Sequence, residues 1–341
     1  MVECLPSKQT VASSSLVPRS QKGFFVPPLK SGEPRYLSNS QVELLLECAW
    51  KHKLKYIDDH TEPMTDHLIV GSAAHKGVEI YRIAQMEGRL GDWSEAQRDQ
   101  AVRAAVNDEF DKLCWDAEAG YVRDGKQVPA PGLVWSKGIA RDHARLLANR
   151  LVEAYFYRAA ESDIPGSPKV PLAQMEEPIG IEEEFYVPIP QTANWFAKGR
   201  FDMRTKTGLV DLKTAKQRYS QRDMNKKTQP SFYAFAWEQQ TGVFLPEFRY
   251  HMLIKPTPST WIPGDGPPPE NLAAYRTAVQ RTTRRIEEIR WFENFLRQQI
   301  FQIEMGAQVP RQNADFCDFC GVAKQCKPWL NTTVDHHFDA E

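Results

Sequence analysis

The segment "GLVDLKTAK", Gly208 to Lys216, decides how the rest of the chain is interpreted. Apolar residues lead into Asp211, and Lys213 follows two positions later, so an acid and a base share one face of an expected strand. Burial in a strand makes charge costly unless the charge is paired. A local ion pair explains an isolated D-x-K motif well. The surrounding sequence therefore has to show whether this motif is a structural ion pair or part of a catalytic site.

Two expected strands precede this segment and place a second acid beside it. "PIGIEEEFYVPI" alternates as a strand does. Its predicted inward residues are Ile179, Ile181, Glu183, Phe185, Val187 and Ile189. The next strand, "WFAKGRFDMR", joins "LVDLKT" through a turn at "TKTG". Opposed residues of this hairpin then have numbers that sum to 413, which places Asp202 directly across from Asp211.

Two facing carboxylates repel each other, and a divalent cation between them would remove the repulsion. Oxygen ligands of this kind suit Mg²⁺ or Mn²⁺. Lys213 could then polarise or deprotonate a water, or stabilise charge on a phosphate. The alternative is an ion network of Asp202, Lys213 and Asp211 without a metal.

The other segments predict helices around these strands. Ser40 followed by Glu43 predicts a capped helix, and another helix is expected from about Gly71. A helix is also predicted between Thr228 and Gly242, with Pro230 in its first turn. "EFRYHMLIK" predicts a strand, and a single long helix is expected over 270–305.

This pattern predicts an α/β or α+β fold in which helices flank one central mixed sheet. The domain is expected over 37–330, after a flexible leader at 1–36 and before a tail at 331–341. Within this domain we expect a mainly helical part at 37–165, the catalytic sheet core at 174–256, and a cysteine segment at 315–330.

The composition is that of a globular protein, with 41% hydrophobic and 26% charged residues in 341. A net charge of −1 means that any affinity for nucleic acid has to come from local patches. No apolar run is long enough for a membrane helix and no secretory signal is evident, so we expect a cytoplasmic protein encoded by a bacterium or phage.

Three cysteines lie close together near the end of the chain: Cys317, Cys320 and Cys326. They leave a four-ligand site short of one thiolate, and Cys48 is the natural fourth. The alternatives are structural zinc and free thiols, although zinc sites more often use two C-x-x-C pairs. Cys4 and Cys114 are expected to take no part.

A run of basic residues follows the acid pair and predicts contact with DNA phosphates. Its members are Lys216, Arg218, Arg222, Lys226 and Lys227. Tyr219 could stack on a base, which suits single strands or frayed ends. A solvated charged loop is the alternative.

The motifs in chain order are Gly71 and His75 in "GSAAHKGVE", Asp202 in "GRFD", Asp211 and Lys213 in "DLK", and Gln229 and Tyr233 in "QPSFY". Over roughly Cys48 to Cys326 this set resembles the RecB-type branch of the PD-(D/E)XK nuclease superfamily. Position 211 carries aspartate where glutamate is commoner in that superfamily.

The resemblance implies metal ligation by His75, Asp202, Asp211 and the backbone carbonyl of Leu212, with Lys213 as the catalytic lysine. Gln229 and Tyr233 would line the DNA channel or position the scissile phosphate. Glu79, one turn from His75, would either face the site or remain solvated.

The cysteine pattern is similar to that of AddB-type helicase-nucleases and CRISPR-associated adaptation nucleases. In those proteins a [4Fe–4S] cluster joins the N-terminal helix to the C-terminal tail, which implies the same role for Cys48, Cys317, Cys320 and Cys326 here.

The resemblance implies a metal-dependent DNA exonuclease or end-processing enzyme in repair, recombination or phage DNA metabolism. The alternatives are a structure-specific endonuclease and a non-catalytic iron–sulfur scaffold that binds DNA. Linear DNA, as single strands or ends, is the expected partner. The sequence lacks a G-x-x-x-x-G-K-[ST] loop, so any unwinding would need a partner such as a helicase or recombination protein.

Overall fold

The structure is a computed structural model that describes residues 34–123, 126–245, 247–309, 317, 320–323 and 325–326. The predicted leader therefore lies outside the described residues except at its last positions, and so does the tail after 326. None of the described helices is both long enough and apolar enough to cross a membrane.

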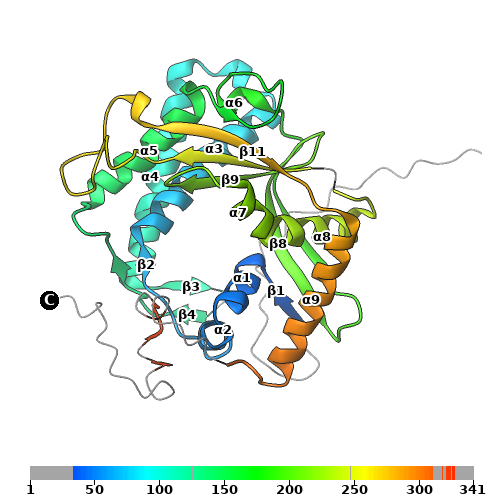
Figure 1. Ribbon diagram of the computed structural model, residues 1–341. Helices are drawn as coiled ribbons and strands as arrows, with labels where there is room; N and C mark the ends of the chain where they lie inside the picture. Colours follow the sequence, from blue (N-terminus) through cyan, green and yellow to red (C-terminus); the bar gives the residue numbers. More distant parts are fainter. Residues whose placement is uncertain are drawn as a thin grey trace, which may run out of the picture.

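The described helices alternate with strands along the chain (Figure 1). The α-helices are α1 Asn39–Glu47, α2 Ala49–Tyr56, α3 Asp66–Met86, α4 Glu95–Ala119, α5 Arg141–Tyr157, α6 Leu172–Met175, α7 Gln221–Lys226, α8 Gln229–Thr241 and α9 Ile286–Glu304. Two 3₁₀ turns are η1 Arg89–Asp92 and η2 Leu272–Ala274. The strands are β1 Arg35–Leu37, β2 Met64–Thr65, β3 Tyr121–Arg123, β4 Lys126–Val128, β5 Leu133–Val134, β6 Glu161–Ser162, β7 Gly180–Pro188, β8 Trp195–Arg204, β9 Leu209–Ala215, β10 Phe248–Ile254 and β11 Arg276–Thr282.

Seven strands form the central sheet in the order β1-β8-β9-β10-β11-β6, with β7 paired to β8. The sheet is mixed, because β9 and β10 run parallel whereas β7, β8 and β9 pair antiparallel in succession. β2 pairs with β5, and β3 with β4, in two small sheets outside it. The predicted fold, a mixed sheet flanked by helices, is confirmed.

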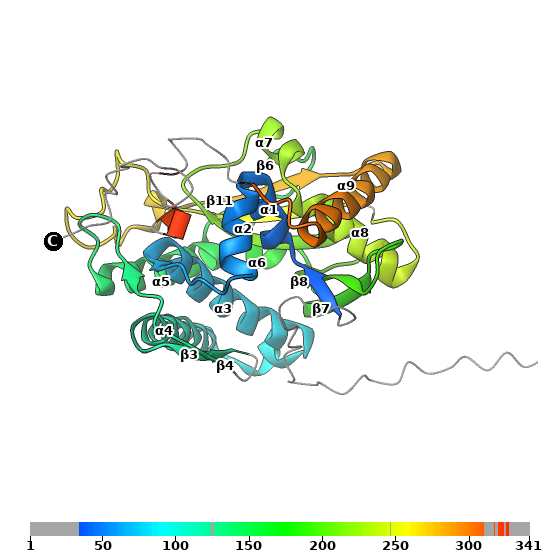
Figure 2. The same cartoon turned by 90° about the horizontal axis from the view of Figure 1, so that it is seen from below.

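Each face of the sheet carries its own apolar core (Figures 1 and 2). One core packs α1, α8 and α9 on the sheet, with Phe232 and Phe292 among its fully buried side chains. The other packs α3, α4 and α5, and includes Phe110 and Leu151. Strand β9 contributes to both cores, Leu209 to the first and Leu212 to the second, because successive side chains point to opposite faces.

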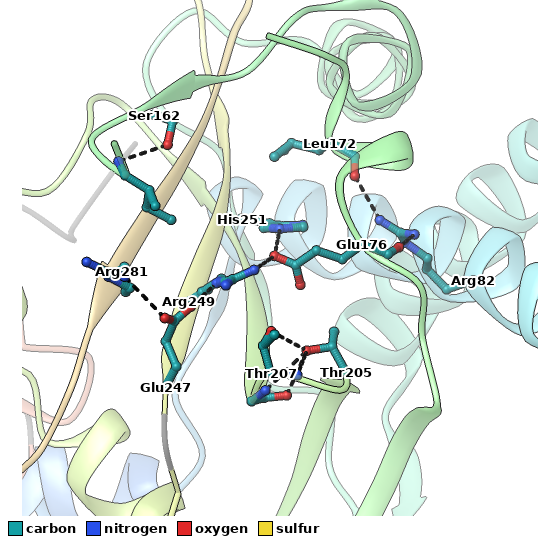
Figure 3. Close-up of polar contacts among 12 residues, drawn as sticks. Arg82, Ser162, Leu172, Glu176, Thr205, Thr207, Glu247, Arg249, His251 and Arg281 are labelled. Carbon is teal, nitrogen blue, oxygen red and sulfur yellow. Dashed lines mark hydrogen bonds and ion pairs between the residues drawn. The ribbon is translucent and has the colours of Figure 1, made fainter. Parts of the chain in front are cut away.

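The β8–β9 hairpin has the predicted register at the two pairs next to its turn, but the ladder ends before the two acids. Met203 pairs with Val210 and Arg204 with Leu209, and both pairs have numbers that sum to 413. The Thr205 N–H donates to the Gly208 carbonyl across the turn at 2.9 Å. The Thr205 hydroxyl also accepts from the Thr207 N–H at 3.3 Å (Figure 3). This local turn fixes the register.

The N-terminal part begins earlier than predicted. Arg35–Leu37 forms strand β1, parallel to the start of β8, so the expected leader boundary at 36 falls inside the sheet. The cap of α1 is Ser38, not Ser40: its hydroxyl accepts from the Gln41 N–H at 3.3 Å. The chain enters the helix two residues early because it leaves the sheet at Leu37.

The long helix expected over 270–305 is wrong in its first half. Arg276–Thr282 is strand β11, antiparallel to β10 along seven pairs from Phe248↔Thr282 to Ile254↔Arg276. Ala278 and Val279 are fully buried although basic residues flank them. Within this segment only 286–304 is α-helical, as α9. The free edge of β10 decides this segment, because pairing there satisfies its backbone groups.

Two smaller expectations also change. α3 begins at Asp66, five residues before the expected start near Gly71. Along β7 the predicted inward pattern holds at Phe185 and Val187, whereas Ile179 lies before the strand and is 40% exposed. The predicted helix between Thr228 and Gly242 is confirmed, with Gly242 as a left-handed C-cap, whereas Thr228 makes no side-chain cap hydrogen bond.

Candidate active site

Four elements bring the predicted site residues together: α3, β8, β9 and the start of α8. Asp211 is the most deeply buried, with 2% of its side chain exposed. Its Oδ1 accepts a hydrogen bond from Gln229 Nε2 at 2.7 Å, and its Oδ2 lies 2.9 Å from Lys213 Nζ. Acid and base of the D-x-K motif therefore form a buried ion pair on the α8 side of the sheet.

Asp202 lies one step beyond the last β8–β9 pair, Met203 with Val210, and the ladder contains no pair between Asp202 and Asp211. The predicted direct opposition of the two acids is therefore wrong, although they remain neighbours. Asp202 Oδ2 accepts from the Leu212 backbone N–H at 3.0 Å and lies 3.6 Å from His75 Nδ1. The two carboxylates are therefore neighbours that face different partners, Asp202 towards α3 and Asp211 towards α8.

The environment of Asp202 and Asp211 disfavours the charged form of both carboxylates. Burial raises the pKa of Asp211 to about 6 against the opposing effect of Lys213, and the charge on Asp202 adds to the rise. Burial likewise raises the pKa of Asp202. A carboxylate with a raised pKa gains stability from added positive charge.

Lys213 supplies the nearest positive charge. Burial by itself would lower the pKa of Lys213, but the charges on Asp211 and Asp202 outweigh burial and raise it. The lysine therefore stays protonated in this arrangement. Its ammonium group is suited to stabilising negative charge on a phosphate, and it is a poor general base.

His75 lies above Asp202 on α3, with about a third of its side chain exposed (32%). Burial lowers the pKa of His75 to about 4, Lys213 lowers it further, and a hydrogen bond to the Leu212 backbone opposes them. The imidazole is therefore neutral at physiological pH, which is the form that binds metal ions.

Gln229 and Tyr233 lie one turn apart on α8 and connect the acid pair to β8. Gln229 Nε2 also donates to the Tyr233 hydroxyl at 3.3 Å, and this hydroxyl donates to the Arg200 carbonyl at 3.0 Å. Both side chains are buried. Their described contacts orient Asp211 and the end of β8.

A pocket beside His75 and Asp202 contains two more acids, Glu79 and Glu182. Glu79 thus faces the site, although Lys76 Nζ pairs with it at 2.8 Å. Glu182 was missed by the sequence analysis, because simple alternation along β7 turned Glu183 inward instead. A left-handed backbone at Glu182 (φ 52°) brings this side chain to the pocket, where it pairs with Arg200.

A buried ion network lies on the α3 side of the sheet, and the sequence analysis missed it. We call Arg82, Glu176, Arg249 and His251 the Glu176 network (Figure 3). Glu176 Oε1 pairs with the Arg249 guanidinium and lies 3.6 Å from His251 Nε2. Arg82 donates to the carbonyls of Glu176 and Leu172 at 2.7 and 2.8 Å.

Among the described residues, no group of three or more His, Cys, Asp or Glu side chains is arranged to hold a metal ion. The donors at His75, Asp202 and Asp211 are nevertheless those that Mg²⁺ and Mn²⁺ accept, one nitrogen and two carboxylates. Two buried acids with raised pKa values are also the setting that an added cation would relieve.

A family model described as the PD-(D/E)XK nuclease superfamily matches residues 36–327. The chain belongs to the PD-(D/E)XK nuclease superfamily. No curated protein matches it. Members of this superfamily are typically nucleases that use Mg²⁺ or Mn²⁺, so membership supports a metal-dependent phosphodiester hydrolase.

The basic residues after the PD-(D/E)XK acid pair do not form one loop. Gln221–Lys226 is helix α7, capped by Ser220 and Asp223. Arg218 pairs with Glu161 and Asp163, and Lys227 lies 4.2 Å from the centre of the Tyr219 ring. Tyr219 itself packs edge-on against Tyr250, which leaves its ring less open for stacking on a base than expected. Lys216, Arg222 and Lys226 are exposed.

The predicted cysteine set lies at the other end of α1 from the sheet. Cys48 links α1 to α2, and its thiol caps α2 by accepting from the Lys51 N–H at 3.4 Å. Burial raises the pKa of the Cys326 thiol to about 11, and the neighbouring Cys48, Cys320 and Cys317 add to it. Cys48, Cys317 and Cys320 of this PD-(D/E)XK protein are thus near enough to Cys326 to influence its thiol, but the described cysteines form neither a disulfide nor an arranged metal site. Cys114 is buried in the α3–α5 core, and Cys4 lies outside the described residues.

Proposed function

We propose that the chain is a metal-dependent DNA exonuclease or end-processing nuclease of the cytoplasm, acting in DNA repair, recombination or phage DNA metabolism. The observation that carries the proposal is the buried Asp211–Lys213 pair beside Asp202 and His75, inside a PD-(D/E)XK fold. An ordinary ion pair would not need a second buried carboxylate next to it.

His75, Asp202, Asp211 and the Leu212 carbonyl would hold the metal ion. When bound, Mg²⁺ or Mn²⁺ activates a water and stabilises charge on the phosphate. The chain supports this chemistry in two ways: protonated Lys213 stabilises the negative charge that develops on the phosphate, and Gln229 keeps the Asp211 carboxylate in position.

Cleavage of linear and covalently closed DNA by the purified protein tests the proposal. We expect linear single- or double-stranded DNA with Mg²⁺ or Mn²⁺ to be degraded from its ends, and Asp202→Asn and Lys213→Ala to lose about a thousandfold or more in rate. Cleavage of closed circles would instead assign a structure-specific endonuclease. Undiminished activity in both variants would overturn the assignment of the site.

We also propose that Cys48, Cys317, Cys320 and Cys326 hold a [4Fe–4S] cluster. The support is the donor set itself: four thiols from the two ends of the described chain, with Cys326 near the other three. A cluster there would join the α1–α2 junction to the C-terminal segment. Anaerobically purified protein should be brown and contain iron and sulfide; a colourless protein with one zinc would assign structural zinc instead.

A helicase or recombination protein is the partner class that this proposal favours, because the chain has no phosphate-binding loop for ATP. Addition of such a partner with ATP should extend degradation of duplex DNA beyond its frayed ends.

A further inference from the structure

Three basic side chains from separate segments meet at the exit of strands β9 and β10. Lys216 follows the last residue of β9, and Lys255 follows the last residue of β10. The Lys255 N–H donates to the Ala215 carbonyl at 2.9 Å, which keeps the two lysines on adjacent strand ends. His67, in the first turn of α3, lies with its Nδ1 3.2 Å from Lys255 Nζ.

The position of these groups relative to the active site follows from the packing of α3 on β9. A Cβ atom at Gly71 would lie only 3.0 Å from Thr214 Oγ1, so the helix and strand are in close contact there. His67 is one turn before Gly71, and His75 is one turn after it. The basic group thus lies about 12 Å along the helix axis from His75.

The contacts between α3 and β9 advance along both elements from the active site to the three basic residues. His75 lies next to Asp202 and Leu212, Gly71 next to Thr214, and His67 next to the lysines that follow β9. A polyanionic strand with one phosphate at Asp211 and Lys213 could therefore follow the edge of α3 to the basic group.

Lys216, Lys255 and His67 have fewer acidic than basic side chains among their described neighbours. Asp66 lies nearby, with its Oδ2 3.6 Å from His67 Nδ1, but its Oδ1 accepts from both the N–H and the hydroxyl of Ser136. Burial lowers the pKa of Lys255; Asp66 opposes this and Lys216 adds to it. A bound anion would reduce the repulsion between the charges of Lys216 and Lys255. Arg218, by contrast, already has two carboxylates.

We propose that Lys216, Lys255 and His67 form a subsite for a backbone phosphate of the DNA strand, two helical turns along α3 from the scissile phosphate. Lys216 and Lys255 contact the phosphate, and His67 positions Lys255 by accepting a hydrogen bond from its ammonium group. The proposal rests on the proposed nuclease function, because it assigns a contact to the same substrate. Of the three residues, only Lys216 belongs to the basic run expected to contact DNA.

A scan of single neutral phosphates tests the subsite. Oligodeoxynucleotides that carry one methylphosphonate at successive positions are bound to the full-length protein in EDTA, which prevents cleavage. For the wild type we expect binding about tenfold weaker when the linkage at the subsite is neutral. In the Lys216→Gln/Lys255→Gln double variant this positional penalty should disappear.

Salt dependence gives a second readout. The double variant should have a salt slope that is lower by roughly 0.7 for each phosphate of single-stranded DNA that it no longer neutralises. Lys206→Gln is the matched control: it removes the same charge from an exposed lysine at the turn before β9, at the opposite end of the strand. It should keep both the wild-type slope and the wild-type positional profile. Lys255→Arg, which retains the charge, should preserve most of the binding.

The outcomes separate the two proposals. If the wild type cleaves DNA but the double variant keeps the same slope and the same positional penalty, the subsite is wrong and the nuclease assignment remains. If the wild type neither binds nor cleaves DNA, the nuclease assignment is wrong and the subsite falls with it.

Discussion

The active site and the Glu176 network lie on neighbouring positions of the same two strands, yet they treat their acids in opposite ways. Asp211 pairs with Tyr250 in the β9–β10 ladder, and the next pair is Leu212 with His251. Burial raises the pKa of Asp211 to about 6. Burial would also raise the pKa of Glu176, but His251 and Arg249 outweigh it and hold it at about 2.

The difference lies in how many cations each acid has. Glu176 has the Arg249 guanidinium for a single carboxylate, and it also lies 3.6 Å from His251, whose own pKa is lowered by burial. In the active site, Asp211 and Asp202 share Lys213 as their nearest cation. A satisfied buried acid holds a fold together, whereas a pair of acids short of positive charge lowers stability and is ready to accept a cation.

The largest expected effect separates activity from stability. Asp211→Asn should reduce DNA cleavage about a thousandfold or more, because it removes a proposed metal ligand. Its free energy of unfolding at neutral pH should be equal to or higher than that of the wild type, because a charge held at a raised pKa is removed. Activity assays and urea unfolding in EDTA measure the two.

Asp265→Asn is a suitable control, since Asp265 is exposed and distant in sequence. A large loss of stability in Asp211→Asn would show that the acid pair is a structural element like the Glu176 network, and would remove the contrast between them.

The opposite result is expected for the network. Glu176→Gln should lower the free energy of unfolding by about 2 kcal/mol, because it removes the more deeply buried of the two carboxylates that pair with Arg249 and leaves only Glu247. Cleavage by the folded protein should persist. Urea unfolding against Glu177→Gln, an exposed neighbouring acid, measures the effect. Equal midpoints for the two variants would refute a stabilising role for the network.

A third buried titratable group sharpens the comparison, because it is neutral. His52 lies between Gln41 Oε1 at 3.2 Å and Gln308 Nε2 at 2.9 Å, and burial lowers its pKa from 6.5 to about 4. The unfolded chain binds the proton more readily, so the stability from neutral His52 is complete above pH 6.5 and is lost as the pH falls towards 4.

At pH 5 this loss should be about 2 kcal/mol relative to pH 7.5. Urea unfolding of the wild type and His52→Gln at both values isolates it, and the variant should show a smaller drop. The same drop in both proteins would mean that His52 is not the group that titrates.

The smallest effect is expected at the link between the acid pair and β8. Tyr233→Phe removes the hydroxyl that donates to the Arg200 carbonyl and accepts from Gln229, which should cost about 1 kcal/mol of stability. Cleavage should fall only slightly, because Gln229 still holds Asp211. A loss of activity as large as that of Asp211→Asn would place Tyr233 in contact with the substrate.

Local sequence was sufficient wherever neighbouring residues decide the structure. The turn at Thr205–Gly208 determines the register of the two pairs next to it, so counting correctly placed Asp202 near Asp211, although the ladder ends before the two acids pair. Pro230 in the first turn and the left-handed Gly242 mark the two ends of α8. These features depend on contacts a few residues long, and the sequence contains them directly.

Where distant segments decide, prediction failed. The helical stripe of Ile289, Phe292, Leu296 and Ile300 suggests one long helix over 270–305, but pairing with the free edge of β10 makes its first half strand β11. The Glu176 network could not be found either, because its residues come from α3, β10 and the turn before β7, and no local pattern joins them. Glu182 could not be predicted as a site residue, because its left-handed backbone (φ 52°) interrupts the alternation of β7.

The sequence by itself thus determined the chemistry of the site: which acids, which lysine and which helix residues come together, because they lie on one hairpin and the helix that follows. Only the tertiary structure decided the pKa values, and hence the charges, of those groups. The cations around each buried acid include side chains distant in the sequence, such as Arg249, 73 residues after Glu176, and the ratio of cations to acids separates Asp211 from Glu176.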